Sequence, residues 1–208
     1  KLTNSKIRIN QFIQNNIFFL IIINLGNFLN FISQFFLSRN LDSDNFGLYV
    51  TCLNLLSIFT TITIVSPIII RNYFNIKDKL IMNNFILLKK ILIYYFIYWL
   101  FTCIILILFR NYFNNILKID HNYIIFFFII TTASINIMSI LYGLFISINR
   151  YKTGALINSL NPFLRFLLLI IFFYFISKEA TNLIFTTLYA SLIVIIVSFI
   201  FLLYGYKE

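Results

Sequence analysis

One charged side chain lies deep inside a long apolar segment of this sequence. Arg165 is about eleven residues from either end of the segment 154–176, and no long apolar segment contains an Asp or Glu that could pair with it. Asn158 and Asn161 share its helical face, and Pro162 frees a backbone carbonyl that can accept hydrogen bonds. These groups, together with carboxamides of the first apolar segment, are possible structural partners. Alternatively, the guanidinium gives a wet cavity positive potential for an anionic headgroup such as a lipid-linked pyrophosphate, which it can bind bidentately.

Polar side chains also form stripes along three further apolar segments, each on one helical face at about 100° per residue. The stripes contain Asn16, Asn24, Asn27, Asn30 and Gln34 in the first segment, Thr51, Asn54, Ser57 and Thr61 in the second, and Thr132, Asn136, Ser139, Gly143 and Ser147 in the fourth. Amides and hydroxyls that face lipid lose their hydrogen bonds to water, so we expect the stripes to share a polar interior. The alternative is that they only join helices to one another. The substrate-cavity candidates are Arg165, Asn161, Asn158, Asn24, Asn27, Asn54 and Asn136.

The elements that must position these residues are membrane-spanning helices. The chain has 208 residues, of which 61% are hydrophobic and only 11% are charged. A soluble domain of this size does not need so much apolar surface, whereas roughly 20 mostly apolar residues cross about 30 Å of hydrocarbon. We therefore expect an all-α integral membrane protein, a six-transmembrane-helix bundle that forms one domain over residues 1–208. The expected helices are at about 11–38, 48–70, 91–109, 123–147, 154–176 and 182–204.

The charges between the apolar segments predict the orientation. The formal net charge is +10, but the basic residues form no stripe beside exposed aromatics, so we expect no nucleic-acid partner. One side of the expected membrane would hold Lys1, Lys6, Arg8, Arg71, Lys77, Lys79, Lys89, Lys90, Arg150, Lys152 and Lys207, and the other Arg39, Arg110, Lys118 and Lys178. The positive-inside rule then predicts a multi-pass protein of the cytoplasmic membrane with both termini in the cytoplasm. In the third helix, Tyr94, Tyr95, Tyr98 and Trp99 suit contact with lipid and headgroups.

The sequence contains little that could support enzymatic chemistry. Cys52 and Cys103 fall within apolar segments without metal-ligand spacing, and His121 is the single histidine. No phosphate-binding loop, catalytic triad or paired-carboxylate pattern occurs. We therefore expect no enzyme, no cofactor and no metal site.

The turn between the first two apolar segments carries a family resemblance. Its residues run Ser38-Arg39-Asn40-Leu41 and then Asp42-Ser43-Asp44-Asn45-Phe46-Gly47-Leu48-Tyr49. This stretch resembles the A-R-x-L-G-x-x-x-(F/Y)-G-x-Y segment of the polysaccharide repeat-unit flippases, which belong to the MOP exporter superfamily. The match covers Arg39, Leu41, Phe46, Gly47 and Tyr49. It departs at Asp42, where the family usually has Gly, and at Val65-Ser66-Pro67, where an Asp-Leu-Gly-like segment is usual.

This resemblance implies a transporter that flips a lipid-linked oligosaccharide across the membrane for surface polysaccharide biosynthesis, such as lipopolysaccharide or capsule. These flippases have two six-helix lobes around a central cavity, so the chain would correspond to the N-terminal lobe, and a C-terminal lobe would be its missing partner. The chain would then be either a fragment or a half-size relative. Alternating access between the lobes would move the substrate. The alternatives are a multidrug exporter of the same superfamily and a structural membrane subunit that transports nothing.

Overall fold

The computed structural model describes residues 2–65, 67–70, 81–117, 123–148 and 150–204, and these residues form an all-α structure. Five of its helices are long and apolar enough to cross a membrane, through the spans Leu20–Asn40, Lys89–Leu108, Ile124–Ser147, Lys152–Phe175 and Ala180–Tyr204. The all-α membrane class expected from the sequence therefore agrees with the fold. The helices are α1 (Leu2–Asn40), α2 (Ser43–Phe59), the 3-10 helix η1 (Thr61–Ile64), α4 (Ile81–Leu108), α5 (Arg110–Leu117), α6 (Tyr123–Ser147), α7 (Tyr151–Phe175) and α8 (Ala180–Tyr204).

The expected second helix, 48–70, differs from the structure. The α-helix α2 ends at Phe59 after 17 residues, and η1 follows it. The run Thr60-Thr61-Ile62-Thr63-Ile64-Val65 is β-branched throughout, which lowers helix propensity, and Pro67 disfavours the helical conformation at the residue before it. Threonine hydroxyls also compete for backbone carbonyls here, because Thr60, Thr61 and Thr63 each donate to a carbonyl three or four residues earlier.

The backbone groups at this break find partners on other helices. The Tyr98 hydroxyl of α4 donates to the Phe59 carbonyl at 2.8 Å, and the Ser139 hydroxyl of α6 donates to the Thr63 carbonyl at 2.6 Å. Irregular backbone at membrane depth requires such internal partners, since lipid offers none. The two side chains thus stabilise the interrupted segment and attach it to α4 and α6.

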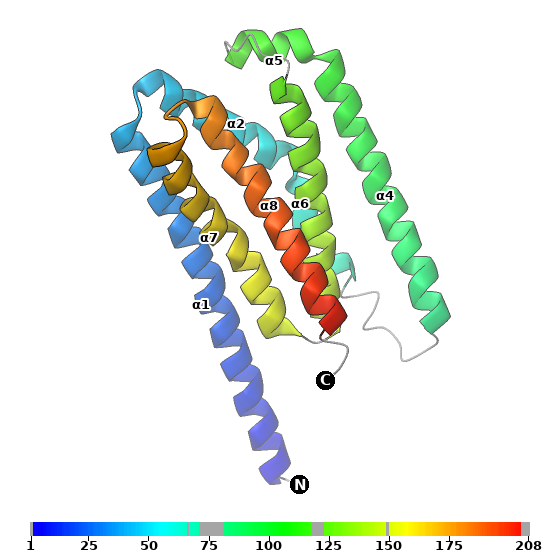
Figure 1. The fold of residues 1–208 in the computed structure, drawn as a ribbon. Helices are drawn as coiled ribbons and strands as arrows, with labels where there is room; N and C mark the ends of the chain where they lie inside the picture. The colour runs from blue at the N-terminus through cyan, green and yellow to red at the C-terminus, as the bar shows by residue number, and fades with distance from the viewer. Residues whose placement is uncertain (1, 66, 71–80, 118–122, 149, 205–208) are drawn as a thin grey trace.

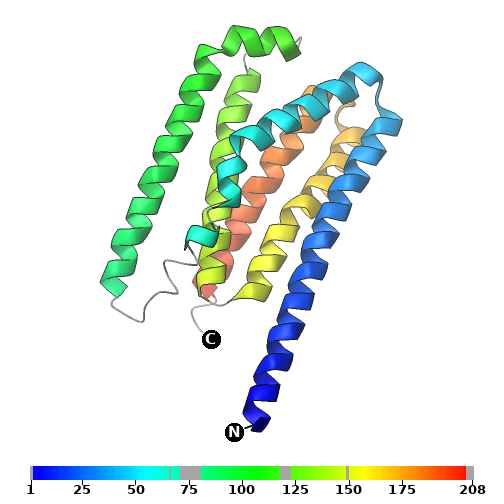
Figure 2. The same ribbon diagram turned by 180° about the vertical axis from the view of Figure 1, so that it is seen from behind.

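The long helices form a layer. Figures 1 and 2 show α1, α7, α8 and α6 in that order, with α2 crossing one face of the layer over α8 and α6, and α4 beside α6. α1 and α4 run in the same direction. The chain therefore has to return between them: it runs through α2, η1 and residues 67–70 from the side of the bundle at which α1 finishes toward the side at which α4 starts (Figure 1). The start of α1 and the end of α8 lie at one end of the molecule.

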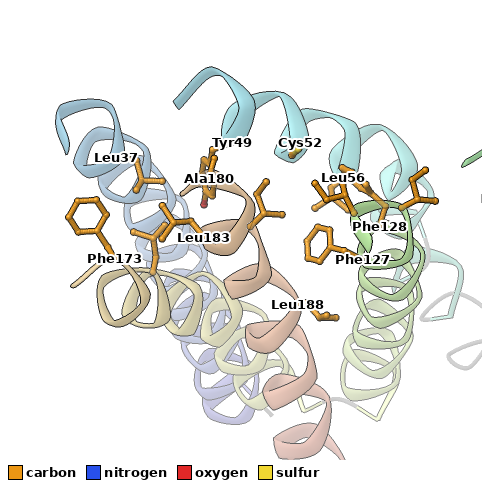
Figure 3. Close-up of a cluster of buried hydrophobic side chains, with 14 of the residues drawn as sticks. Leu37, Tyr49, Cys52, Leu56, Phe127, Phe128, Phe173, Ala180, Leu183 and Leu188 are labelled. Carbon is orange, nitrogen blue, oxygen red and sulfur yellow. The ribbon is translucent and has the colours of Figure 1, made fainter. Parts of the chain in front are cut away.

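The main hydrophobic cluster lies at the opposite end, beneath the α1–α2 turn. Figure 3 shows Tyr49, Cys52 and Leu56 of α2 pointing toward side chains of the layer, among them Leu37 of α1 and Leu183 of α8. Tyr49 and Leu37 are fully buried. Two smaller clusters, around Phe145 and around Ile140, hold the other half of the bundle. Buried apolar packing is therefore more extensive at the end of the bundle with the α1–α2 turn than at the end with the termini.

Candidate functional site

Arg165 lies at the contact between α7 and α1. Its Nη2 donates a hydrogen bond to Oδ1 of Asn30 at 2.6 Å, while its Nε is buried and has no partner in the part of the chain that the structure describes. The side chain is half-buried, and it is the fifteenth residue of the 25-residue helix α7. A carboxamide of the first helix is therefore the observed partner, one of the structural options that the sequence left open. A neutral amide leaves the positive charge of the guanidinium uncompensated.

Gly26, Ser33 and Leu37 form the face of α1 that packs on its neighbours. All three are buried, and a Cβ added to Gly26 would lie 3.0 Å from Cγ of Pro162 on α7. At about 100° per residue these three positions fall within about 40° of one another. Gly26 therefore permits the close approach of α1 and α7.

The carboxamide stripe of α1 lies beside this contact face rather than on it. Asn24, Asn27 and Gln34 are exposed, and their positions are centred roughly 110° around the helix from Gly26. Asn30 lies between the stripe and the contact face and is half-buried. Because Arg165 binds Asn30, the guanidinium emerges on the same flank of the α1–α7 contact as the stripe. The Asn16 side chain lies outside the described residues.

Asn158 and Asn161 share the Arg165 face of α7, as the sequence predicted. Both side chains are half-buried, and Oδ1 of Asn161 is a buried acceptor that no described residue binds. The structure thus places Asn158, Asn161 and Arg165 on one flank with the α1 carboxamides. We call this group, Asn24, Asn27, Asn30, Asn158, Asn161 and Arg165, the polar flank.

The stripe of α2 also points away from the packed layer. Thr51, Asn54 and Ser57 are exposed, while Tyr49 and Cys52 on the opposite face are buried. Asn54 therefore lies on the outer surface of α2, whose inner face contacts α8, α6 and α1.

Asn136 does not join the polar flank. It lines a groove formed by α4 and α6, and its stripe neighbours Ser139 and Gly143 contact η1 and residues 67–70. The expected single polar interior is therefore divided between two places. The reason is the interrupted segment after α2, because α6 turns its small and hydroxylated face toward that backbone.

The residues of the turn motif have separate structural environments. Arg39 is exposed at the end of α1, with its guanidinium carbon 4.6 Å from the centre of the Phe35 ring. Phe46 packs against the main cluster, and Tyr49 is fully buried with its hydroxyl unpartnered. Gly47 is exposed, and a Cβ added there would meet nothing within 4 Å. Local packing therefore does not require glycine at position 47.

Asp42, the departure from the family pattern, has a clear local role. It is the N-cap of α2, where its carboxylate accepts the Asn45 backbone N–H at 3.4 Å and the Asn45 side-chain amide at 2.8 Å. The side-chain hydrogen bond from Asn45 is the main cause that lowers the pKa of the Asp42 carboxyl. Oδ1 of Asn45 in turn accepts the Ala180 N–H at 3.3 Å. The turn before α2 is thereby joined to the first residue of α8.

Sequence reasoning missed Tyr98, Ser139 and Asn45 as organising residues. Tyr98 and Trp99 were expected to face lipid, but both point inward, and Trp99 Nε1 donates to the Ile129 carbonyl at 3.1 Å. Tyr94, by contrast, is 72% exposed, as expected. The available signal was the β-branched run before Pro67, which indicated a helix break with carbonyls in need of donors.

Comparisons with family models, curated proteins and solved structures found no match. The resemblance to polysaccharide flippases therefore rests on the residues of the α1–α2 turn.

Proposed function

We propose that this chain is one lobe of a membrane transporter that flips a lipid-linked oligosaccharide across the cytoplasmic membrane by alternating access. The observation that carries the proposal is Arg165, which bears a positive charge near the middle of a membrane-length helix with an amide as its hydrogen-bond partner. It lies on a flank with several other amides. The similarity of the α1–α2 turn to the flippase motif supports the same class.

The energetics favour an anionic substrate group. A charged arginine at the centre of a bilayer costs at least about 2.5–3.5 kcal/mol unless it faces protein or water. The bond to Asn30 uses Nη2 of the guanidinium, and Nε has no partner. A phosphate or pyrophosphate group would both compensate the charge and accept parallel hydrogen bonds.

The exposed polar surfaces of α1 and α2 fit a lobe that faces a partner. Asn27 and Asn54 are poor neighbours for lipid, because their amides would lose hydrogen bonds to water without replacement. A second lobe opposite the polar flank would enclose a wet cavity between the two. Rocking of the lobes about that cavity is the general mechanism of such transporters.

The orientation follows from the charges at the two ends of the bundle. Lys89, Lys90 and Lys152 lie near the starts of α4 and α7, whereas Arg39 and Lys178 lie at the opposite end. By the positive-inside rule, the end that carries the start of α1 is cytoplasmic. The interrupted segment from α2 to residues 67–70 then makes the second of six crossings.

The test compares membrane abundance with surface polysaccharide in the same cells. Arg165→Ala should insert and accumulate normally but lose export, and Arg165→Lys should recover only part of it because an ammonium cannot bind in a bidentate manner. The matched control is Arg110→Ala, which removes an exposed guanidinium at the start of α5, outside the turn motif. Normal abundance with normal export for Arg165→Ala would contradict the proposal, and loss of the protein itself would indicate a structural arginine.

A further inference from the structure

The groove between α4 and α6 is a second site, separate from the polar flank. It has a volume of about 270 Å³, and its lining combines apolar and aromatic residues, among them Tyr95 and Trp99, with the amide of Asn136. Phe96 and Leu92 of α4 and Ile137 of α6 are each at least 44% exposed at its margin. In a membrane-spanning bundle, such a groove opens to the hydrocarbon and receives its occupant from the bilayer.

Asn136 favours a ligand of this groove that can form hydrogen bonds with an amide. The residue is 5% exposed, and neither Nδ2 nor Oδ1 has a hydrogen-bond partner among the described residues. A buried amide that lacks partners costs about 1–3 kcal/mol for each unsatisfied group. A hydroxyl group can satisfy both atoms at once, since it donates to Oδ1 and accepts from Nδ2.

Asn136 lies too deep in the membrane to contact the polar groups of ordinary lipids. It lies 13 residues after the start of α6 and 11 before its end, which at about 1.5 Å per residue is about 20 Å and about 17 Å. Ester and phosphate groups lie near the membrane surfaces, so only the alkyl chain of a lipid would reach Asn136. An alkyl chain leaves the amide unpaired. A single water bound to Nδ2 and Oδ1 takes about 30 Å³ and would leave most of the groove unfilled.

The walls favour a flat ring. Trp99 is held by its hydrogen bond to the Ile129 carbonyl, and the Phe96 and Trp99 ring centres are 5.9 Å apart. A third ring can pack against this pair in an offset or edge-to-face arrangement. The volume suffices, because an apolar cavity of about 150 Å³ already binds benzene.

We propose that the α4–α6 groove binds a neutral, membrane-soluble small molecule with an aromatic body and one hydroxyl group, which pairs with the Asn136 amide. This site is independent of Arg165 and of the flippase proposal. Its ligand is uncharged and enters from the hydrocarbon, whereas the polar flank is suited to an anionic group in water.

The chain supplies its own reporter, because Trp99 is the single tryptophan in the sequence and lines this groove. The full chain is placed in phosphatidylcholine nanodiscs, and Trp99 fluorescence is titrated with 4-bromophenol, whose bromine quenches indole emission. The matched ligand is 4-bromotoluene, in which a methyl group replaces the hydroxyl. We expect saturable quenching by the phenol and only linear, partition-driven quenching by the toluene.

Three substitutions in the chain test whether saturable binding takes place in the groove. Asn136→Leu should weaken saturable binding of 4-bromophenol at least about tenfold, and Ala133→Phe, which fills the groove, should abolish it. Asn111→Leu, at an exposed position on α5, should bind like the unaltered chain. Linear quenching by the phenol in the unaltered chain would overturn the proposal and leave lipid chains as the occupant. Equal affinity in Asn136→Leu, or saturable binding that survives Ala133→Phe, would overturn it as well.

Discussion

Individual side chains in this bundle act mainly by supplying hydrogen bonds to backbone that lipid cannot satisfy. Tyr98 and Ser139 bind carbonyls at the break after α2, and Asn45 binds the first N–H of α8. Their roles were not predictable from residue type, because a tyrosine in an apolar helix is equally compatible with the lipid surface. Arg165 was different, since a lone charge in an apolar segment required a partner whatever the fold. The sequence limited that partner to a carbonyl or a carboxamide, and the structure places Asn30 there.

The hydrogen bond from Tyr98 makes a first prediction. Tyr98→Phe should lower the free energy of unfolding by about 1–3 kcal/mol, because the Phe59 carbonyl loses its donor in a region without water. Tyr94→Phe is the matched control, since Tyr94 is 72% exposed on the same helix, and its effect should stay within about 0.5 kcal/mol. Denaturation of the purified variants in detergent measures both. Equal stability of the two variants would show that the carbonyl finds another donor.

At the scale of elements, the length of the apolar segments predicted the positions of most helices. The expected helix 123–147 coincides with α6, and the expected 154–176 and 182–204 lie close to α7 and α8. The first expected helix, 11–38, is extended in the structure to Leu2–Asn40. The expected 48–70 was wrong as a single helix, because hydropathy does not register the low helix propensity of a β-branched run before proline.

Replacement of two helical glycines by alanine should change the stability of the protein in opposite directions. Gly47→Ala should raise stability by about 0.5–1 kcal/mol, because the alanine methyl has free space and alanine favours helix. Gly143→Ala should lower it by about 1–3 kcal/mol, because its Cβ would lie 2.8 Å from Cδ1 of Ile70 and 3.1 Å from Cα of Pro67. Thermal unfolding of the two variants beside the unaltered chain measures the difference.

The two glycine variants also distinguish a role of the turn motif in transport from a role in packing. If Gly47→Ala is more stable yet loses transport, the glycine of the turn motif is needed for movement or substrate contact rather than for folding. A destabilised Gly47→Ala would contradict the open environment described for this position. A neutral Gly143→Ala would show that residues 67–70 can withdraw from α6 at little cost.

At the scale of the whole molecule, the stripes do not share the single polar interior expected from the sequence, because Asn27 and Asn54 are exposed whereas Asn136 is buried beside α4. The direction of a stripe depends on which other face of the helix makes the closest contact. Gly26 against Pro162 turns the α1 carboxamides to the side of the contact, and Gly143 against Ile70 turns the α6 stripe toward α4. Those long-range contacts carry no periodic signal, so the separation of Asn136 from Arg165 was not predictable.

The proposed orientation predicts which end of the bundle a membrane-impermeant thiol reagent reaches. With Cys52 and Cys103 replaced by alanine, Ser43→Cys should react from outside intact cells, and Lys152→Cys should react only after the cells are opened. Both positions are exposed and lie at opposite ends of the layer. The reverse pattern would contradict the placement of both termini in the cytoplasm.

The central claim is that the polar flank and the outer face of α2 border water inside the membrane. The most direct measurement is the reaction of single cysteines with a charged thiosulfonate in native membranes, at Asn27 of α1, Asn54 of α2 and Ile196 of α8. All three positions are exposed in the structure, but only the first two lie on polar faces. We predict rapid modification of Asn27→Cys and Asn54→Cys and none of Ile196→Cys, whereas equal resistance of all three would contradict a wet cavity at this face.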